Sequence, residues 1–285
     1  LGVLSGVNSR WSKSLYSYLF VLLIGLYAYA LYSADWNSEI AMLSLCSALA
    51  LWQKASDRVP YLLDSVAAPP SRVALADSLI AATIFFALQN MVSVVLRHYV
   101  HGDATSRIVL AYICAGALTY ALVRGTFAAL NTNGIPKLLG PDLAQSIRTG
   151  VATGLLCASV GIGYLWFARR HGFLPDTAAP QLLPTQARAA IGLLTVLAAP
   201  LFEEFIFRGL IFGGMRRSIR LPMSTLGSAA LFAIAHPLTS LAPLFVLGIA
   251  TAWVYEHKQA LLAPMLTHAV YNAAIVGYSV FVIQS

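Results

Sequence analysis

Two adjacent glutamates and an arginine, Glu203, Glu204 and Arg208, lie in the middle of an apolar run from Ala189 to Met215. An apolar run of this length is a candidate transmembrane helix. A charged side chain near the centre of such a helix costs about 2.5–3.5 kcal/mol on insertion scales, so such residues are rare and usually functional. Three of them within six residues therefore predict a polar site inside a membrane.

The composition agrees with a membrane protein. Of the 285 residues, 59% are hydrophobic and only 10% are charged, whereas soluble domains carry about 25% charged residues. The net charge of +7 fits the Lys and Arg residues that membrane proteins collect in cytoplasmic loops, so we expect membrane lipid and no nucleic acid as a partner. The cysteines, Cys46, Cys114 and Cys157, lie in apolar segments without ligand-like spacing, which predicts small core residues.

Hydropathy divides the chain into eight or nine apolar segments. The expected spans are 14–32, 40–52, 73–96, 108–123, 149–168, 189–215, 224–235, 241–255 and 260–283. No repeat is visible, and no polar stretch is long enough for a separate domain. The sequence therefore predicts an all-α fold, a polytopic transmembrane helical bundle of about 8–9 spans with no soluble domain. We expect one membrane domain, with residues 1–188 as N-terminal transmembrane helices and residues 189–285 as the helices that carry the site.

The basic residues predict an orientation. With the N-terminus in the cytoplasm, 12 of the 18 Lys and Arg residues fall in inside loops and five in outside loops. This bias follows the rule that cytoplasmic loops are rich in Lys and Arg. We expect an integral multi-pass protein of the bacterial inner (plasma) membrane, with a cytoplasmic N-terminus.

Polar residues from three segments reach a similar depth in this topology. At the rise of an α-helix, Glu203, Glu204 and His268 lie roughly 15 Å from the cytoplasmic ends of their segments. His236 lies roughly 18 Å from that side. The shared depth predicts that side chains far apart in the sequence meet at one buried site.

Spacing within the segments suggests what these side chains do. Glu204 and Arg208 are four residues apart, so they share a helix face and can pair. Glu203 points about 100° away and is left free for chemistry. His268 and Asn272 are also four apart. A His with a nearby Asn, facing a Glu and a second His, can activate water and stabilise an oxyanion.

Each feature taken alone has a structural alternative. A lone His in an apolar segment is more often a hydrogen-bonded packing residue than a ligand. A Glu–Arg pair can hold helices together or belong to the ion path of a transporter. An Asn can link transmembrane helices. Their occurrence together, at one depth, favours a site.

Three motifs of the C-terminal third resemble the CPBP family, the membrane-embedded group of CAAX prenyl endopeptidases and bacterial relatives tied to bacteriocin processing and self-immunity. The motifs are, in order, Glu203-Glu204-x-x-x-Arg208, Phe232-x-x-x-His236 and His268-x-x-x-Asn272. The resemblance covers residues 189 to about 274. Residues 1–188 carry no recognised motif and are interpreted as an extension.

The resemblance implies a hydrolase, an intramembrane endopeptidase of the CAAX-protease type. Its substrate would be a membrane-associated protein or peptide, which could carry a lipid. By this resemblance, Glu203 activates the attacking water with the help of His236. His268 and Asn272 stabilise the oxyanion. Glu204 and Arg208 form a supporting pair, and Phe232 packs the helix that presents His236.

The resemblance leaves two options for a cofactor, none or zinc. The family is often labelled a metalloprotease, and Glu203, His236 and His268 could bind Zn²⁺ through one oxygen and two nitrogens. The sequence lacks the zinc helix of the His-Glu-x-x-His type. We therefore slightly favour a metal-free, glutamate-dependent reaction.

Two other classes of function remain as alternatives. In a non-proteolytic immunity or scaffold protein the polar core would be structural, but a scaffold has no need for two His and an Asn beside the Glu pair. A transporter would be supported by paired inverted repeats, and the sequence shows none.

Overall fold

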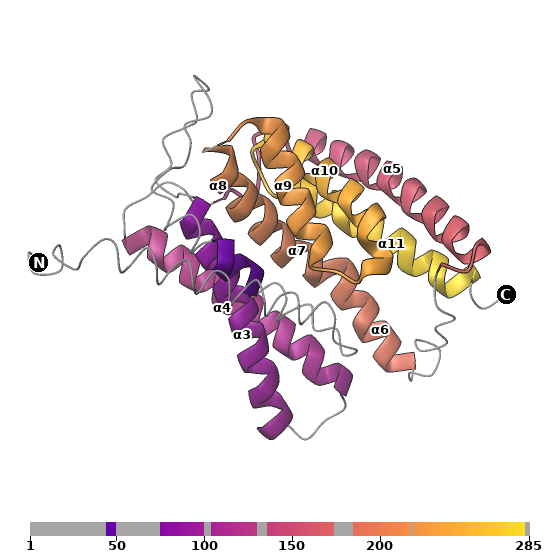
Figure 1. The fold of residues 1–285 in the computed structure, drawn as a ribbon, viewed down its shortest axis with the longest axis horizontal. Coiled ribbons are helices and arrows are strands. Elements are labelled where there is room, and N and C mark those ends of the chain that lie inside the picture. The colour runs from indigo at the N-terminus through magenta and orange to yellow at the C-terminus, as the bar shows by residue number, and fades with distance from the viewer. Residues whose placement is uncertain are drawn as a thin grey trace, which may run out of the picture.

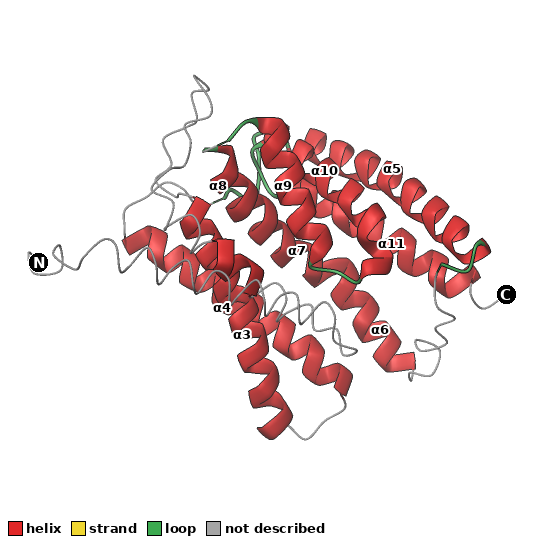
Figure 2. Cartoon of the chain, viewed as in Figure 1, coloured by secondary structure: helices red, strands yellow, loops and turns green. Residues whose placement is uncertain are grey.

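The computed structural model describes residues 44–49, 75–99, 104–129, 136–173, 185–217 and 219–282. Within these ranges every regular element is a helix and there is no strand (Figure 2). The prediction of an all-α fold is confirmed for this part of the chain. The expected span at 14–32, and all of the span at 40–52 except residues 44–49, lie outside the described residues.

The first two long helices, α3 (Leu75–Tyr99) and α4 (Ala104–Ala129), pack against each other and form one side of the molecule in Figure 1. Phe85 and Tyr112 join them edge to face, with ring centroids 6.0 Å apart. Helix α3 also contacts the π-helical segment η3 (Phe205–Phe212), and α4 contacts α6 (Thr185–Leu193). Both segments belong to the motif-bearing stretch. The N-terminal helices therefore cover one side of that stretch.

Helix α5 (Leu143–Arg170) begins earlier than hydropathy predicted, because the expected span started at residue 149. The carboxylate of Asp142 caps it by accepting a hydrogen bond from the backbone N–H of Gln145 at 2.8 Å. Such a cap satisfies one of the open N–H groups of a first turn. The polar first turn hides this start from a hydropathy scan.

Helix α5 packs along α11 (Leu262–Val282), and the two lie side by side in Figure 1. Glycines allow the close approach. A Cβ at Gly150 would lie 2.7 Å from the carbonyl oxygen of Ala263, and one at Gly154 would lie 2.7 Å from that of Thr267. Small residues at such contacts let membrane helices approach closely.

The motif-bearing stretch is helical from Thr185 to Arg216 and widens to a π-helix in two places. In order, it consists of α6 (Thr185–Leu193), the π-helical η2 (Leu194–Ala198), α7 (Ala199–Glu204), the π-helical η3 (Phe205–Phe212) and α8 (Gly213–Arg216). Pro200 has no backbone N–H to donate to the preceding turn, which accounts for a widened turn before it. π-Helical insertions in α-helices are frequent at functional sites, and here two of them flank the turn that carries both glutamates.

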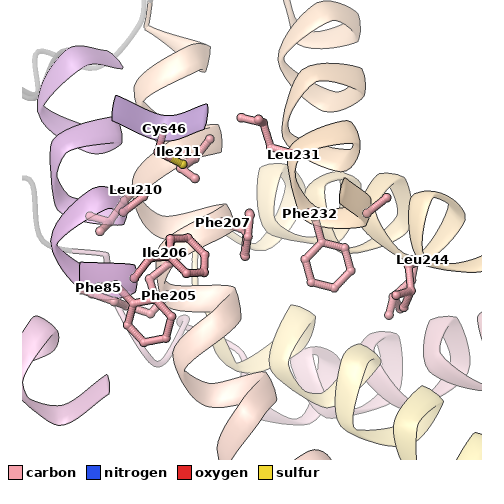
Figure 3. Packing of buried hydrophobic residues seen from close by; sticks show 14 of the residues in the cluster. Cys46, Phe85, Phe205, Ile206, Phe207, Leu210, Ile211, Leu231, Phe232 and Leu244 are labelled. Carbon is pink, nitrogen blue, oxygen red and sulfur yellow. The ribbon is translucent and has the colours of Figure 1, made fainter. Parts of the chain in front are cut away.

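The remaining helices are α9 (Leu221–Ile234) and α10 (Leu241–Lys258), which pack against each other. The short 3₁₀ turn η4 (Leu238–Ser240) lies between them. The buried core runs through η3, where Phe205, Ile206 and Phe207 lie between Phe85 of α3 and Phe232 of α9 (Figure 3).

Four described helices are long and apolar enough to cross a membrane: Ala104–Gly125, Leu143–Arg170, Thr185–Arg216 and Leu238–Lys258. The apolar parts of α3 and α9, Ala81–Leu96 and Leu221–Ile234, are shorter. These helices support an integral membrane protein. The predicted count of eight or nine spans is not confirmed.

Candidate active site

Three of the predicted polar residues meet in one place. Glu203 lies on α7, His236 follows the end of α9, and His268 lies on α11. The Nε2 atom of His236 is 3.8 Å from Oε2 of Glu203, and the Nε2 atom of His268 is 3.9 Å from the same oxygen. Residues far apart in the sequence are thus brought together, as their shared depth predicted.

The second glutamate links the arginine to a histidine. Oε2 of Glu204 is 3.1 Å from Nε of Arg208, so the predicted ion pair is present. Oε1 of Glu204 lies 3.0 Å from Nδ1 of His268. Both side chains of the ion pair are fully buried. Glu204 therefore does more than balance a charge, because it also orients one of the histidines.

Three groups besides Glu204 surround the buried guanidinium of Arg208. Its Nη2 donates hydrogen bonds to the hydroxyl of Thr251 and, at 3.3 Å, to the carbonyl oxygen of Gly248. Its central carbon lies 4.5 Å from the ring centroid of Phe232, within cation–π range. A buried charge is tolerated only when it is paired and hydrogen-bonded, and this arrangement ties η3 to α9 and α10.

Phe232 lies at the centre of the aromatic contacts of the site and is completely buried. Its ring centroid is 4.9 Å from that of His236 and 5.4 Å from that of His268. It also meets Phe207 at 5.2 Å, nearly at a right angle. The sequence predicted only that Phe232 packs the helix that presents His236. The structure shows that the same ring contacts both histidines and Arg208.

Hydrogen bonds at Nδ1 direct the other nitrogen of each imidazole toward Glu203. Nδ1 of His236 lies 2.8 Å from the carbonyl oxygen of Phe232, and a carbonyl oxygen can only accept, so this nitrogen carries a proton. Nδ1 of His268 faces the carboxylate of Glu204 in the same way. In a neutral imidazole the remaining nitrogen, Nε2, is then an acceptor.

The two oxygens of Glu203 have different surroundings. Oε1 accepts a hydrogen bond from the hydroxyl of Tyr112, on α4, at 2.8 Å. Oε2 is buried and accepts no hydrogen bond from the described part of the chain, whereas buried polar atoms normally have a partner. A water molecule that donates to Oε2, between the two Nε2 atoms, would satisfy it.

Asn272 lies one helical turn beyond His268 on α11. Its side-chain nitrogen donates a hydrogen bond to the carbonyl oxygen of Thr195, in η2, at 2.7 Å. This bond satisfies a carbonyl in a widened turn and joins α11 to the helix that carries Glu203. It uses one of the two hydrogens of the amide, and the predicted contact with an oxyanion stays a prediction.

The donors suit zinc in type but are widely spaced. Glu203, His236 and His268 supply one oxygen and two nitrogens, and both imidazoles have the outer hydrogen bonds that zinc ligands show. Tetrahedral zinc with bonds of about 2.1 Å would set the oxygen roughly 3.4 Å from each nitrogen, less than the 3.8 and 3.9 Å found. Among the described residues no group of three His, Cys, Asp or Glu is arranged to hold a metal ion. The residues therefore do not fit zinc as they stand, and the metal-free reaction that the sequence favoured stays a prediction.

Two residues of the site were missed by the sequence reasoning. Tyr112 and Thr251 are hydroxyl-bearing residues in apolar helices, and neither belongs to a motif. Their importance comes from contacts with Glu203 and Arg208 on other helices. No local spacing signals such contacts.

Comparison with known families agrees with this geometry. Residues 185–274 match the family model of Rce1-like type II CAAX prenyl endopeptidases. The predicted family resemblance is confirmed. The match covers about a third of the 285 residues. Neither the curated proteins nor the solved structures give a match.

The Rce1-like segment begins with α6 and ends within α11. It contains every residue of the three motifs, from Glu203 to Asn272. Tyr112 lies outside it, on α4. A family match of this kind, together with the apolar helices, supports a protease that is an integral membrane protein with a protein or peptide as substrate.

Proposed function

We propose that the chain is an intramembrane endopeptidase that hydrolyses a peptide bond of a membrane-associated protein or peptide. The observation that carries this proposal is the cluster of Glu203, His236 and His268, with both Nε2 atoms within 3.9 Å of one carboxylate oxygen. The Rce1-like match supports the reaction class. A prenylated peptide is the first substrate to test, because the family description names prenyl endopeptidases.

The proposed reaction begins with a water held by Oε2 of Glu203 and Nε2 of His236. Glu203 removes a proton from the water as it attacks the carbonyl carbon, so a C–O bond forms and the carbonyl oxygen becomes an oxyanion. The proton on Glu203 then passes to the leaving nitrogen as the C–N bond breaks. General base and acid catalysis by a positioned carboxylate contributes about 10²–10⁴-fold.

His268 and Asn272 are proposed to stabilise the oxyanion. For Nε2 of His268 to donate a hydrogen bond while Nδ1 faces Glu204, the imidazole must carry both protons. The cluster holds two carboxylates and the guanidinium of Arg208, so a protonated His268 would balance its charge. The second hydrogen of the Asn272 amide would supply a further donor.

The decisive experiment replaces the proposed general base by an amide of the same size and, separately, truncates its partner histidine. Glu203→Gln and His236→Ala are expected to lower kcat for a prenylated peptide in proteoliposomes by at least about 10²-fold, with the unfolding temperature close to wild type. Arg188→Gln, at an exposed position on α6, is the control and should cleave normally. Full activity in both site variants would refute the proposal. A cellular effect that survives Glu203→Gln would instead favour the scaffold alternative.

The metal question has its own measurement. Elemental analysis of the purified protein, with and without chelator, is expected to find no stoichiometric zinc and no loss of activity on chelation. Zinc at one equivalent, lost in His236→Ala, would show that the donors close around an ion.

A further inference from the structure

We propose that Tyr112, on helix α4 and outside the Rce1-like segment, is a positioning residue that holds Glu203 in its reactive orientation. This inference rests on the proposed function, because it assigns Tyr112 to the same site. Its basis is the hydrogen bond from the Tyr112 hydroxyl to Oε1 of Glu203 at 2.8 Å. The N-terminal helices would then complete the active site.

The hydrogen bond gives the two oxygens of the Glu203 carboxylate different roles. Oε1 is occupied by Tyr112, and Oε2 is turned toward Nε2 of His236 and His268. A glutamate side chain rotates easily about its last bond. A donor at one oxygen fixes this rotation, so that the other oxygen stays directed at the place where a water would bind.

The contact between α4 and α7 is shaped to place this hydroxyl. Gly116 lies one turn after Tyr112, and a Cβ there would lie 2.4 Å from the ring of Phe202, the neighbour of Glu203. The Phe202 ring therefore occupies space that only a glycine leaves open. The rings of Tyr112 and Phe202 are 6.2 Å apart, and Tyr112 also packs edge to face on Phe85.

Tyr112 is a neutral side chain beside Glu203, whereas the other polar side chains of the site are charged or basic. His236 and His268 face Oε2, Glu204 is the next residue in the chain, and Arg208 is paired with Glu204. The imidazoles belong to α11 and to the end of α9, whereas Tyr112 approaches from α4. Removing its hydroxyl takes away one hydrogen bond and leaves every formal charge in place.

Tyr112→Phe in the full chain tests the proposal, with Tyr120→Phe as the matched control. Tyr120 is on the same helix and packs its ring on Phe205 at 5.2 Å, and it is exposed and accepts a hydrogen bond from Arg124. Tyr112→Phe is expected to lower kcat about tenfold or more, since a hydrogen bond to a charged group contributes about 1.5–3 kcal/mol. KM should change by less than about twofold, because a positioning residue acts through Glu203 and not on the bound substrate.

Infrared spectroscopy supplies a readout that a purely structural role would not move. The carboxylate band of Glu203, identified by its loss in Glu203→Gln, is expected to shift in Tyr112→Phe and to stay in place in Tyr120→Phe. An unshifted band, or a wild-type kcat in Tyr112→Phe, would overturn the inference. A wild-type chain that cleaves nothing, or a fully active Glu203→Gln variant, would instead overturn the proposed function and this inference with it.

Discussion

At the scale of single residues, the polar site depends on the groups that surround the buried guanidinium of Arg208. Arg208 meets Glu204, Thr251, Gly248 and the face of Phe232. Leaving one donor of a buried charged group without a partner costs its desolvation energy. Arg208 also pairs with Glu204, and Glu204 in turn contacts His268. The position of the guanidinium therefore affects the position of a histidine that takes part in the proposed reaction.

Thr251→Val should show this dependence. Valine has the shape of threonine but leaves Nη2 of Arg208 without the hydroxyl, so we expect a loss of about 1–3 kcal/mol in the free energy of unfolding. Thr251→Ser, which keeps the hydroxyl, should lose less. Reversible unfolding in detergent, followed by circular dichroism, compares the two variants. Equal stabilities would mean that the hydroxyl contributes nothing to holding Arg208.

At the scale of helices, the placement of His268 depends on how α11 meets its neighbours. The backbone of α11 rests on glycines of α5, and the Asn272 side chain fastens it to the widened turn of η2. The residue before His268, Thr267, is the one that a side chain at Gly154 would strike. A shift of α11 would therefore move the imidazole away from Glu203 and Glu204.

Gly154→Ala is expected to impair both folding and cleavage. The added methyl group would lie 2.7 Å from the carbonyl oxygen of Thr267 and from Cβ of Val270, and overpacking of this kind costs about 1–3 kcal/mol. Gly163→Ala, on the same helix with nothing within 4 Å of the new Cβ, is the matched control. Unfolding temperature and kcat are measured for both. Identical behaviour would show that α5 and α11 can separate without harm.

At the scale of the whole molecule, two hydrogen bonds join segments that lie near opposite ends of α5. The backbone N–H of Leu261 donates to the carbonyl oxygen of Lys137 at 2.9 Å, which joins the loop before α5 to the loop before α11. Near the other end of α5, the Tyr164 hydroxyl donates to the carbonyl oxygen of Thr239 at 2.7 Å. The loops before α5 and before α11 therefore lie together at one end of α5, and the turn η4 lies near its other end.

Labelling with a membrane-impermeant maleimide tests which end is cytoplasmic. In a background without the native cysteines, Leu139→Cys should react from the cytoplasmic side and Phe173→Cys from the opposite side, because the basic residues favour this orientation. Both positions are exposed. The labelling of each variant is compared in right-side-out and inverted vesicles. If Leu139→Cys reacted from the outside and Phe173→Cys from the cytoplasmic side, the N-terminus would lie outside.

Some features of the chain are local and could be predicted from the sequence. The helical class follows from apolar runs in which every backbone group must be hydrogen-bonded inside its own segment. The Glu204–Arg208 pair follows from a spacing of four residues. The common depth of Glu203, His236 and His268 follows from a fixed rise per residue along each helix.

Tertiary structure alone decided the surroundings of those residues. Hydropathy gives the length of a helix but not its rotation or its neighbours, so it could not place Tyr112 against Glu203 or Thr251 against Arg208. The widened turns on either side of α7 also escape a sequence pattern. The sequence determined which polar groups the membrane must accommodate, because charge and apolarity are local properties. The packing of separate helices determined which of those groups touch.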